Sequence, residues 1–131
     1  MDKDFRPLQE NERRLVARLL EPRFPGRDEL LAQLEVATAK TIDEDGCFAL
    51  DCSSAPPAPV KSNLPTEGEC LDLDGATLHV QLHVLDGIMR SLEMYKEDGS
   101  TPLRLPDPGA MKLFAAQSED AGVWTRSERF R

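Results

Sequence analysis

The sequence predicts an α+β domain with two N-terminal helices packed on one face of an antiparallel β-meander of about five strands. Three observations predict it: helical periodicity in the first 40 residues, alternating apolar and polar residues afterwards, and glycine-containing turns between the alternating segments. A chain of 131 residues has the size of one domain. We expect residues 1–117 to form it and residues 118–131 to be a flexible C-terminal tail, because the tail has little periodicity.

Two amphipathic helices are expected before the first strand. Between Leu8 and Leu20 the apolar residues recur at helical spacing and form one stripe: Leu15, Val16, Leu19 and Leu20. Pro22 and Pro25 end this helix, since proline cannot continue the helical hydrogen bonds. The segment GRDELLAQLEVA, residues 26–37, has acidic residues in its first turn and a leucine face, which predicts the second helix.

Strand-like segments follow, at residues 37–43, 47–53, 76–84, 88–96 and 101–105. The first two are joined by a turn that ends in Gly46, which predicts a hairpin. Residues 53–66 carry four prolines and predict a surface loop rather than a central strand. Residues 109–117 are expected to form a last short helix.

The strongest alternation is ATLHVQLHV, residues 76–84, and it predicts a strand with one apolar and one polar face. Its partner is IMRSLEMYK, residues 88–96. A two-residue loop would set polar residues against the apolar face. The sequence therefore predicts a three-residue loop at residues 85–87, which pairs Val80 with Leu92 and brings His79 opposite Glu93.

Charge is unevenly distributed along the chain. The net charge is −8, and residues 41–87 hold nine acidic residues against one lysine. Such a field disfavours nucleic acid and anionic membrane as partners and favours a basic protein surface. Acidic turns that only keep a small domain soluble explain the same pattern. The chain has no long apolar segment and no apolar export signal at its start, so we expect a cytoplasmic protein.

No pattern in the sequence indicates a catalytic, cofactor or metal site. There is no phosphate-binding loop, nucleophile elbow or zinc-protease motif. His79 and His83 are expected on one strand, where four residues span about 13 Å, so one metal ion cannot bind both. The cysteines, Cys47, Cys52 and Cys70, are expected to be reduced, partly buried thiols. We therefore predict no catalytic residue, no cofactor and no metal.

Candidate partner-binding residues come from the acidic turns and from the polar face of the expected sheet. Tyrosine and histidine on an exposed sheet supply contact area and hydrogen-bonding tips. The candidates are Asp43, Glu44, Asp45, Asp72, Asp74, His79, Gln81, His83, Glu93 and Tyr95.

Two blocks of the sequence resemble a known family. They are FPGRDELLAQLEVATAKTIDEDGCFAL and DLDGATLHVQLHVLDGIMRSLEMYKEDGSTP, and the resemblance spans about residues 8–108. The family consists of small bacterial proteins with a domain of unknown function. The resemblance implies one α+β domain, and the family has no known catalytic residues that could be assigned to positions of this sequence.

Our leading hypothesis is a non-enzymatic cytoplasmic binding module, in particular an immunity-type inhibitor of a basic toxin or effector. The alternative is a small enzyme or ligand-binding protein that uses a pocket between the helices and the sheet near His79 and Glu93. A third hypothesis is a homodimer that associates through the polar sheet face.

Overall fold

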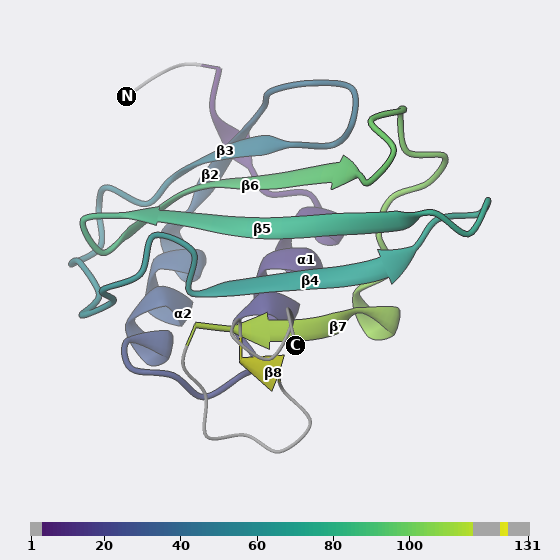
Figure 1. Ribbon diagram of the computed structural model, residues 1–131. Helices are drawn as coiled ribbons and strands as arrows, with labels where there is room; N and C mark the ends of the chain where they lie inside the picture. Colours follow the sequence, from purple (N-terminus) through teal and green to yellow (C-terminus); the bar gives the residue numbers. More distant parts are fainter. Residues whose placement is uncertain (1–3, 117–123, 126–131) are drawn as a thin grey trace.

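Two helices lie behind an eight-stranded sheet in the computed structural model, which describes residues 4–116 and 124–125 (Figure 1). The helices are α1 (Glu10–Leu19) and α2 (Arg27–Val36). The strands are β1 (Arg6–Pro7), β2 (Thr38–Thr41), β3 (Phe48–Asp51), β4 (Thr66–Leu71), β5 (Thr77–Leu85), β6 (Ile88–Lys96), β7 (Lys112–Ala115) and β8 (Trp124–Thr125). A short 3₁₀ helix, η1 (Pro108–Ala110), precedes β7. The α+β class and the two helices are confirmed, although β1 precedes α1.

The order of the strands differs from the expected meander of five. The sheet runs β1-β2-β3-β6-β5-β4-β7-β8, with antiparallel neighbours except for the parallel pair β7–β8. β2 and β3 form the expected hairpin, but β3 then pairs with β6. The chain therefore leaves the sheet after β3, passes through the proline-rich loop of residues 52–65, and re-enters at β4.

Two expected elements near the C-terminal end are wrong. Residues 101–105 form no strand, and Lys112–Ala115, in the middle of the segment expected as a last helix, form the strand β7. Prolines at 102, 106 and 108 exclude a regular ladder, and the apolar residues after them pair with β4 instead. The expected tail, residues 118–131, lies outside the described residues except for β8.

The inner face of the sheet carries the core. Gly68 of β4 marks this face, because a Cβ atom there would lie 2.9 Å from Met111 Sδ and 3.4 Å from Leu19 Cδ2 of α1. Val80 pairs with Gly68 and therefore also points toward the helices. The fully buried residues include Leu15, Leu19, Leu30, Leu78, Val80, Leu82 and Leu92. Alternate residues of β5, among them His79, consequently point away from the helices.

The β5–β6 hairpin corrects the predicted turn. Its loop has two residues, Asp86 and Gly87, with φ of 54° and 76°. Two left-handed residues in succession are the conformation of a type I′ turn. Arg90 is then inserted as a bulge, because Val84 pairs with Met89 while His83 pairs with Ser91. The bulge restores the apolar match that a two-residue loop alone would have lost.

Gln33 of α2 holds this turn in place. Its side chain is fully buried, and its Nε2 donates to the carbonyl oxygens of Gly87 at 2.7 Å and Pro56 at 3.2 Å. Its Oε1 accepts from the backbone N–H of Met89 at 2.9 Å. One side chain therefore connects α2, the proline-rich loop and the hairpin turn.

Candidate functional site

The outer face of β4, β5 and β6 collects glutamates from three separate stretches of the chain. Glu67 and Glu69 lie on β4, Glu93 on β6, and Glu97 directly follows β6. The register sets Glu69 beside His79 and Glu67 beside Gln81. We call this surface, made by these four glutamates with His79, Gln81, His83 and Tyr95, the acidic face.

His79 and Glu67 are the two enclosed side chains of the acidic face, with 7% and 5% of their surfaces exposed. His79 Nδ1 lies 3.5 Å from Glu69 Oε2 and His79 Nε2 lies 3.6 Å from Glu97 Oε1. The ring stacks on Tyr95, with centroids 4.8 Å apart and planes at 15°. Tyr95 itself remains 43% exposed. The stacked rings of His79 and Tyr95 therefore pack together, with the carboxylates of Glu69 and Glu97 on two sides of His79.

A second row crosses the sheet next to the first. Gln81 Nε2 donates to Glu67 Oε1 at 3.2 Å, and Gln81 lies opposite Glu93. His83 Nε2 lies 3.2 Å from Glu93 Oε2, but the two atoms lack the alignment of a hydrogen bond. Glu93 therefore contacts His83 rather than His79, and the expected pairing of His79 with Glu93 is wrong. Because the bulge shifts the register, Tyr95 occupies the place opposite His79.

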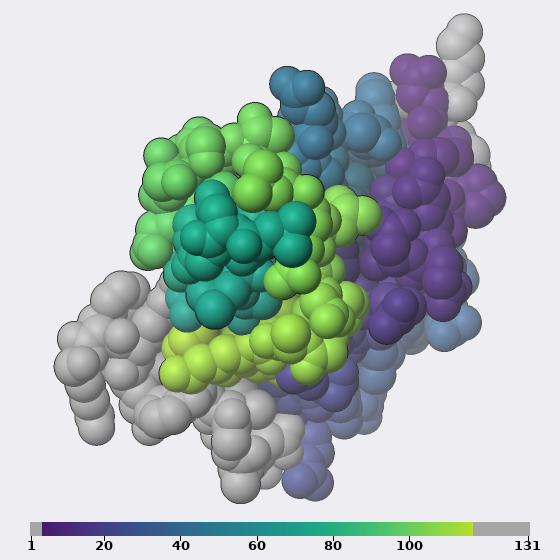
Figure 2. Space-filling model, turned by 90° about the vertical axis from the view of Figure 1, so that its right-hand side faces the viewer, coloured from purple at the N-terminus to yellow at the C-terminus, as the bar shows by residue number. Residues whose placement is uncertain are grey.

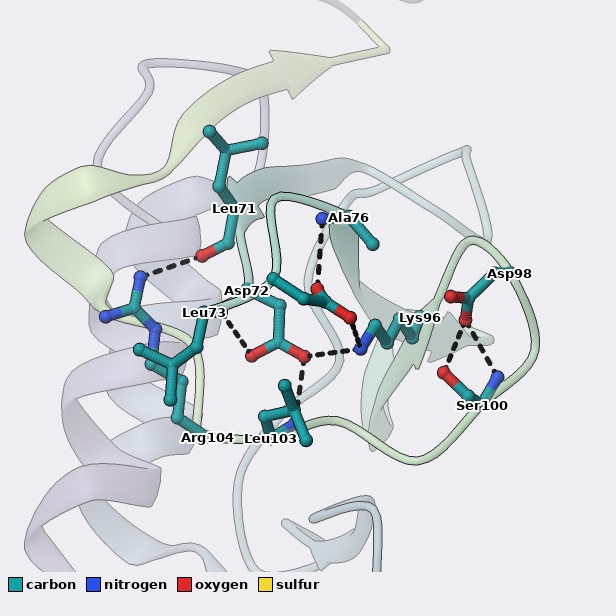
Figure 3. A network of polar contacts seen from close by, with 10 residues as sticks. Leu71, Asp72, Leu73, Ala76, Lys96, Asp98, Ser100, Leu103 and Arg104 are labelled. Carbon is teal, nitrogen blue, oxygen red and sulfur yellow. Dashed lines mark hydrogen bonds and ion pairs between the residues drawn. The ribbon is translucent and has the colours of Figure 1, made fainter.

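Asp72 and Asp74 belong to a different arrangement around Lys96, and Figure 3 shows Asp72 beside this lysine. Lys96 is 4% exposed, and its Nζ lies 3.1 Å from Asp72 Oδ2 and 2.6 Å from Asp74 Oδ2. The Asp72 carboxylate also accepts the backbone N–H groups of Leu73 and Leu103, each at 2.8 Å. These contacts tie the β4–β5 turn to the end of β6 and to the loop that follows it.

Protonation follows from this geometry. Burial would raise the pKa of Asp72, but the two backbone N–H groups and the Lys96 ammonium outweigh it and lower the pKa below its usual value. The hydrogen bond from Lys96 lowers the pKa of Asp74, and that same bond raises the pKa of Lys96. All three groups therefore stay charged at neutral pH, and the lysine neutralises much of the local acidity.

The predicted acidic turn at residues 43–45 is exposed and partly structural. Asp43 Oδ1 accepts the backbone N–H of Asp45 at 3.0 Å and of Cys47 at 3.2 Å, which closes the turn between β2 and β3. Asp43 and Glu44 remain exposed and Asp45 is half-buried. These three residues therefore belong to the β2–β3 turn and not to the strands β4 to β6 that carry the acidic face.

The cysteines are free and buried, as the sequence predicted. Burial raises the pKa of the Cys47 thiol to about 11 and that of Cys52 to about 12. Burial also raises the pKa of Cys70. A nucleophilic cysteine needs a lowered pKa, so these thiols suit packing rather than catalysis.

The pocket expected between the helices and the sheet cannot include His79 or Glu93, because both residues lie on the opposite face of the sheet. The space behind the sheet is filled by core side chains. A groove of about 520 Å³ opens elsewhere, between the α1–α2 connection, the proline-rich loop and the end of β7. Its lining is Phe24, Pro25, Pro59, Val60, Lys61, Ser62, Pro65 and Ala116. These residues form a mainly apolar groove with one lysine, and they include no pair of side chains suited to acid–base catalysis.

Sequence analysis missed three of the four glutamates of the acidic face. Glu67 and Glu69 alternate with Thr66, Gly68 and Cys70, and this period of two was the available signal. Within residues 4–116 and 124–125, no three His, Cys, Asp or Glu side chains are placed to hold a metal ion. The same residues include no helix with the length and apolar character of a membrane span.

Comparison with known proteins identifies a family and no activity. No curated protein and no solved structure matches the chain. A family model described as "Domain of unknown function (DUF6984)" matches residues 5–106. This range holds both helices and β1 to β6, and therefore the whole acidic face. Because the match covers well over half of the sequence, the chain belongs to the DUF6984 family.

Proposed function

We propose that this protein is a non-enzymatic binding module that takes a basic protein partner on its acidic face. The observation that carries the proposal is the placement of Glu69 and Glu97 on two sides of the stacked His79–Tyr95 pair, with the exposed Glu93 in the adjacent row of the same sheet face. Complementary charge speeds encounter and selects partners, whereas an exposed aromatic ring supplies contact energy. The acidic face offers both.

Two of the four glutamates of this face, Glu93 and Glu97, are accessible to a partner. The side chains of Glu93 and Glu97 are 53% and 66% exposed, while the neighbouring Lys96 turns inward to Asp72 and Asp74. A partner with lysine or arginine side chains can therefore reach these glutamates directly. The proposed setting is the cytoplasm of a bacterial cell.

An immunity-type inhibitor is the specific form of the proposal. A small acidic protein can neutralise a basic toxin or effector by covering the surface that the toxin uses on its own target. This form predicts that a neighbouring gene encodes a basic protein that is toxic alone and harmless when coexpressed with this chain. A neighbouring product whose toxicity is unchanged by coexpression would contradict the inhibitor form.

Charge reversal tests the binding module itself. The wild-type protein is immobilised beside the double variant Glu93→Lys/Glu97→Lys, and proteins captured from the native cell are quantified by mass spectrometry. The control is Glu29→Lys/Glu35→Lys, which makes the same change of net charge at exposed positions on α2. We expect the wild type and the control to recover the same basic proteins, and the acidic-face variant to lose them.

The affinity for a purified captured protein then gives the magnitude. Loss of two charge pairs should raise the dissociation constant about tenfold or more near 0.1 M salt, and high salt should narrow the difference. Equal binding by the wild type and the acidic-face variant would refute the proposal. If the α2 control lost as much affinity as the acidic-face variant, net charge alone would explain the loss, and the proposal would be refuted as well.

A further inference from the structure

Four leucines are exposed at the end of the sheet where β4 turns into β5. Leu71, Leu73, Leu103 and Leu105 are 60%, 66%, 57% and 50% exposed. They come from the end of β4, the β4–β5 turn, and the loop after β6. Figure 2 shows this end of the molecule, with the turn in teal bordered by the loop in green. We call these four residues the leucine end.

Hydrogen bonds bring the leucine-bearing segments together. Asp72 accepts the backbone N–H groups of both Leu73 and Leu103, so one buried carboxylate joins the turn to the loop (Figure 3). Arg104 Nη2 donates to the Leu71 carbonyl oxygen at 2.9 Å. These bonds hold a loop without regular secondary structure in one arrangement.

A leucine cluster of this kind indicates a contact surface. Single exposed leucines are ordinary, but Leu73 and Leu103 are held next to each other by one carboxylate, and apolar patches on a soluble domain mark interaction sites. Because the buried Asp72–Lys96 pair already orders the segments, a partner would not have to order them on binding. The leucine end is therefore prepared for binding before a partner arrives.

The surroundings of the leucine end determine the chemistry of its partner. Leu71 follows Glu69 two residues later on the same strand, so it continues the acidic face. Three exposed acidic residues lie in the same two connections as the leucines: Asp74 in the β4–β5 turn, and Glu97 and Asp98 at the start of the loop after β6. Arg104 is the nearby cation, and it already donates to the Leu71 carbonyl. An apolar centre with an acidic border is complementary to apolar side chains flanked by lysine or arginine.

We propose that the leucine end receives an apolar anchor of a basic protein segment, whose lysines and arginines lie on the adjoining acidic face. This inference rests on the proposed function and adds the apolar half of the recognised motif. It predicts that the partner is not merely basic but carries aliphatic or aromatic residues next to its basic ones.

Two labelled peptides test the inference. The first is a lysine-rich peptide with two leucines and one tryptophan, and the second has serine at those three positions. Binding is measured by fluorescence anisotropy near 0.3 M NaCl, where the attraction between exposed charges is strongly screened. The protein variants are Leu73→Ser/Leu103→Ser and, as the control, Leu85→Ser. Leu85 is 51% exposed and lies in the hairpin strand end farthest from the leucine end.

We expect the apolar peptide to bind the wild type and the Leu85→Ser control equally. The double leucine variant should bind it about tenfold more weakly, with little change for the serine peptide. All three leucine substitutions affect exposed side chains, so circular dichroism and melting temperature should stay near those of the wild type.

Three outcomes would overturn the inference. Equal affinity of the wild type for the two peptides would show that the apolar residues contribute nothing to binding. If the variant Glu93→Lys/Glu97→Lys then bound neither peptide, the acidic face would still be supported as the binding surface. Equal weakening by Leu85→Ser would show that the effect is not local. A wild-type dimer that the double leucine variant dissociates would show that a second copy covers this end. If Glu93→Lys/Glu97→Lys left the binding of both peptides unchanged in a repeat near 0.1 M NaCl, where exposed charges still attract, the proposed function would be refuted instead.

Discussion

Replacing Gln33 by leucine should destabilise the fold by about 2 kcal/mol, because one side chain satisfies three backbone groups at a buried junction. Leucine has nearly the same size, so the change removes hydrogen bonds and creates little cavity. Gly87 keeps a second donor, the backbone N–H of Ala58 at 2.8 Å. The exposed Pro56 can turn to water.

Met89 supplies most of the magnitude. It is fully buried, and its backbone N–H loses the partner that Gln33 provides. A buried donor without a partner costs about 1–3 kcal/mol. The transfer of an apolar side chain into the core offsets part of this cost and leaves the net value near 2 kcal/mol. For a domain of this size, the melting temperature should fall by about 6–10 °C.

Urea unfolding followed by circular dichroism measures the effect, with Ala32→Leu as the control. Ala32 is the exposed neighbour on α2, so the same residue is introduced without loss of a hydrogen bond. The control should stay within about 0.5 kcal/mol of the wild type. An equally small change for Gln33→Leu, with the same slope of free energy against urea, would refute the reasoning that Gln33 links helix, loop and turn.

Three further predictions follow from single sites. Gly75→Ala should cost about 1–2 kcal/mol for its left-handed φ of 86°, whereas Gly87→Ala should cost at least about 2 kcal/mol more in urea unfolding, because its Cβ would also clash with the backbone of the proline-rich loop. Asp72 has a folded pKa below its unfolded value near 4, so it stabilises the protein above about pH 4 and loses this effect as the pH falls through the folded pKa. Melting temperatures between pH 6 and pH 2.5 should therefore fall more steeply for the wild type than for Asp72→Asn, and parallel curves would contradict the assignment. The pKa values of Cys47 and Cys52, about 11 and 12, predict that a disulfide reagent at pH 8 labels these two cysteines at least about 100-fold more slowly in the native protein than in the denatured one, as peptide mapping would show, and fast native labelling of either cysteine would contradict its burial.

Elements with strong local periodicity were predictable from the sequence. The leucine stripe of α1 and the alternation of β5 each report on neighbours along the chain, and both were placed within a few residues of their observed bounds. β4 was missed because Gly68 and two glutamates give it little apolar character. Its strand conformation depends on pairing with β5 and β7, which contribute information from distant parts of the chain.

The β5–β6 turn shows a subtler limit of sequence reasoning. The requirement that apolar residues face one another was correct, since Leu82 pairs with Leu92 and Val80 with Met94. A three-residue loop and a two-residue loop followed by a bulge both satisfy it. The second arrangement needs a residue other than glycine with positive φ, and Asp86 accepts this conformation more readily than most residues. Arg90, the polar residue among inward-facing positions, was the sign of the bulge.

The sequence predicted which face of the sheet carries the candidate site, but it did not predict which residues contact one another there. His79, Gln81, His83, Glu93 and Tyr95 share one face, as the alternation required. Their partners on β4 could not be inferred, because that strand had not been assigned. The bulge also shifts the register of β5 and β6, so that Tyr95 lies opposite His79 where Glu93 was expected.

The acidic segment of residues 41–87 has to be divided before its charge can be related to binding. Asp72 and Asp74 share Lys96, which lies outside that segment, so counting charges along the chain overstates the field they produce. Asp43 uses its carboxylate to close a turn. Conversely, Glu93 and Glu97 lie in residues 88–131, where seven acidic and seven basic residues cancel. They still face solvent beside His83 and His79. The field that a partner meets is therefore set by the fold, which turns Lys96 inward and leaves Glu93 and Glu97 exposed.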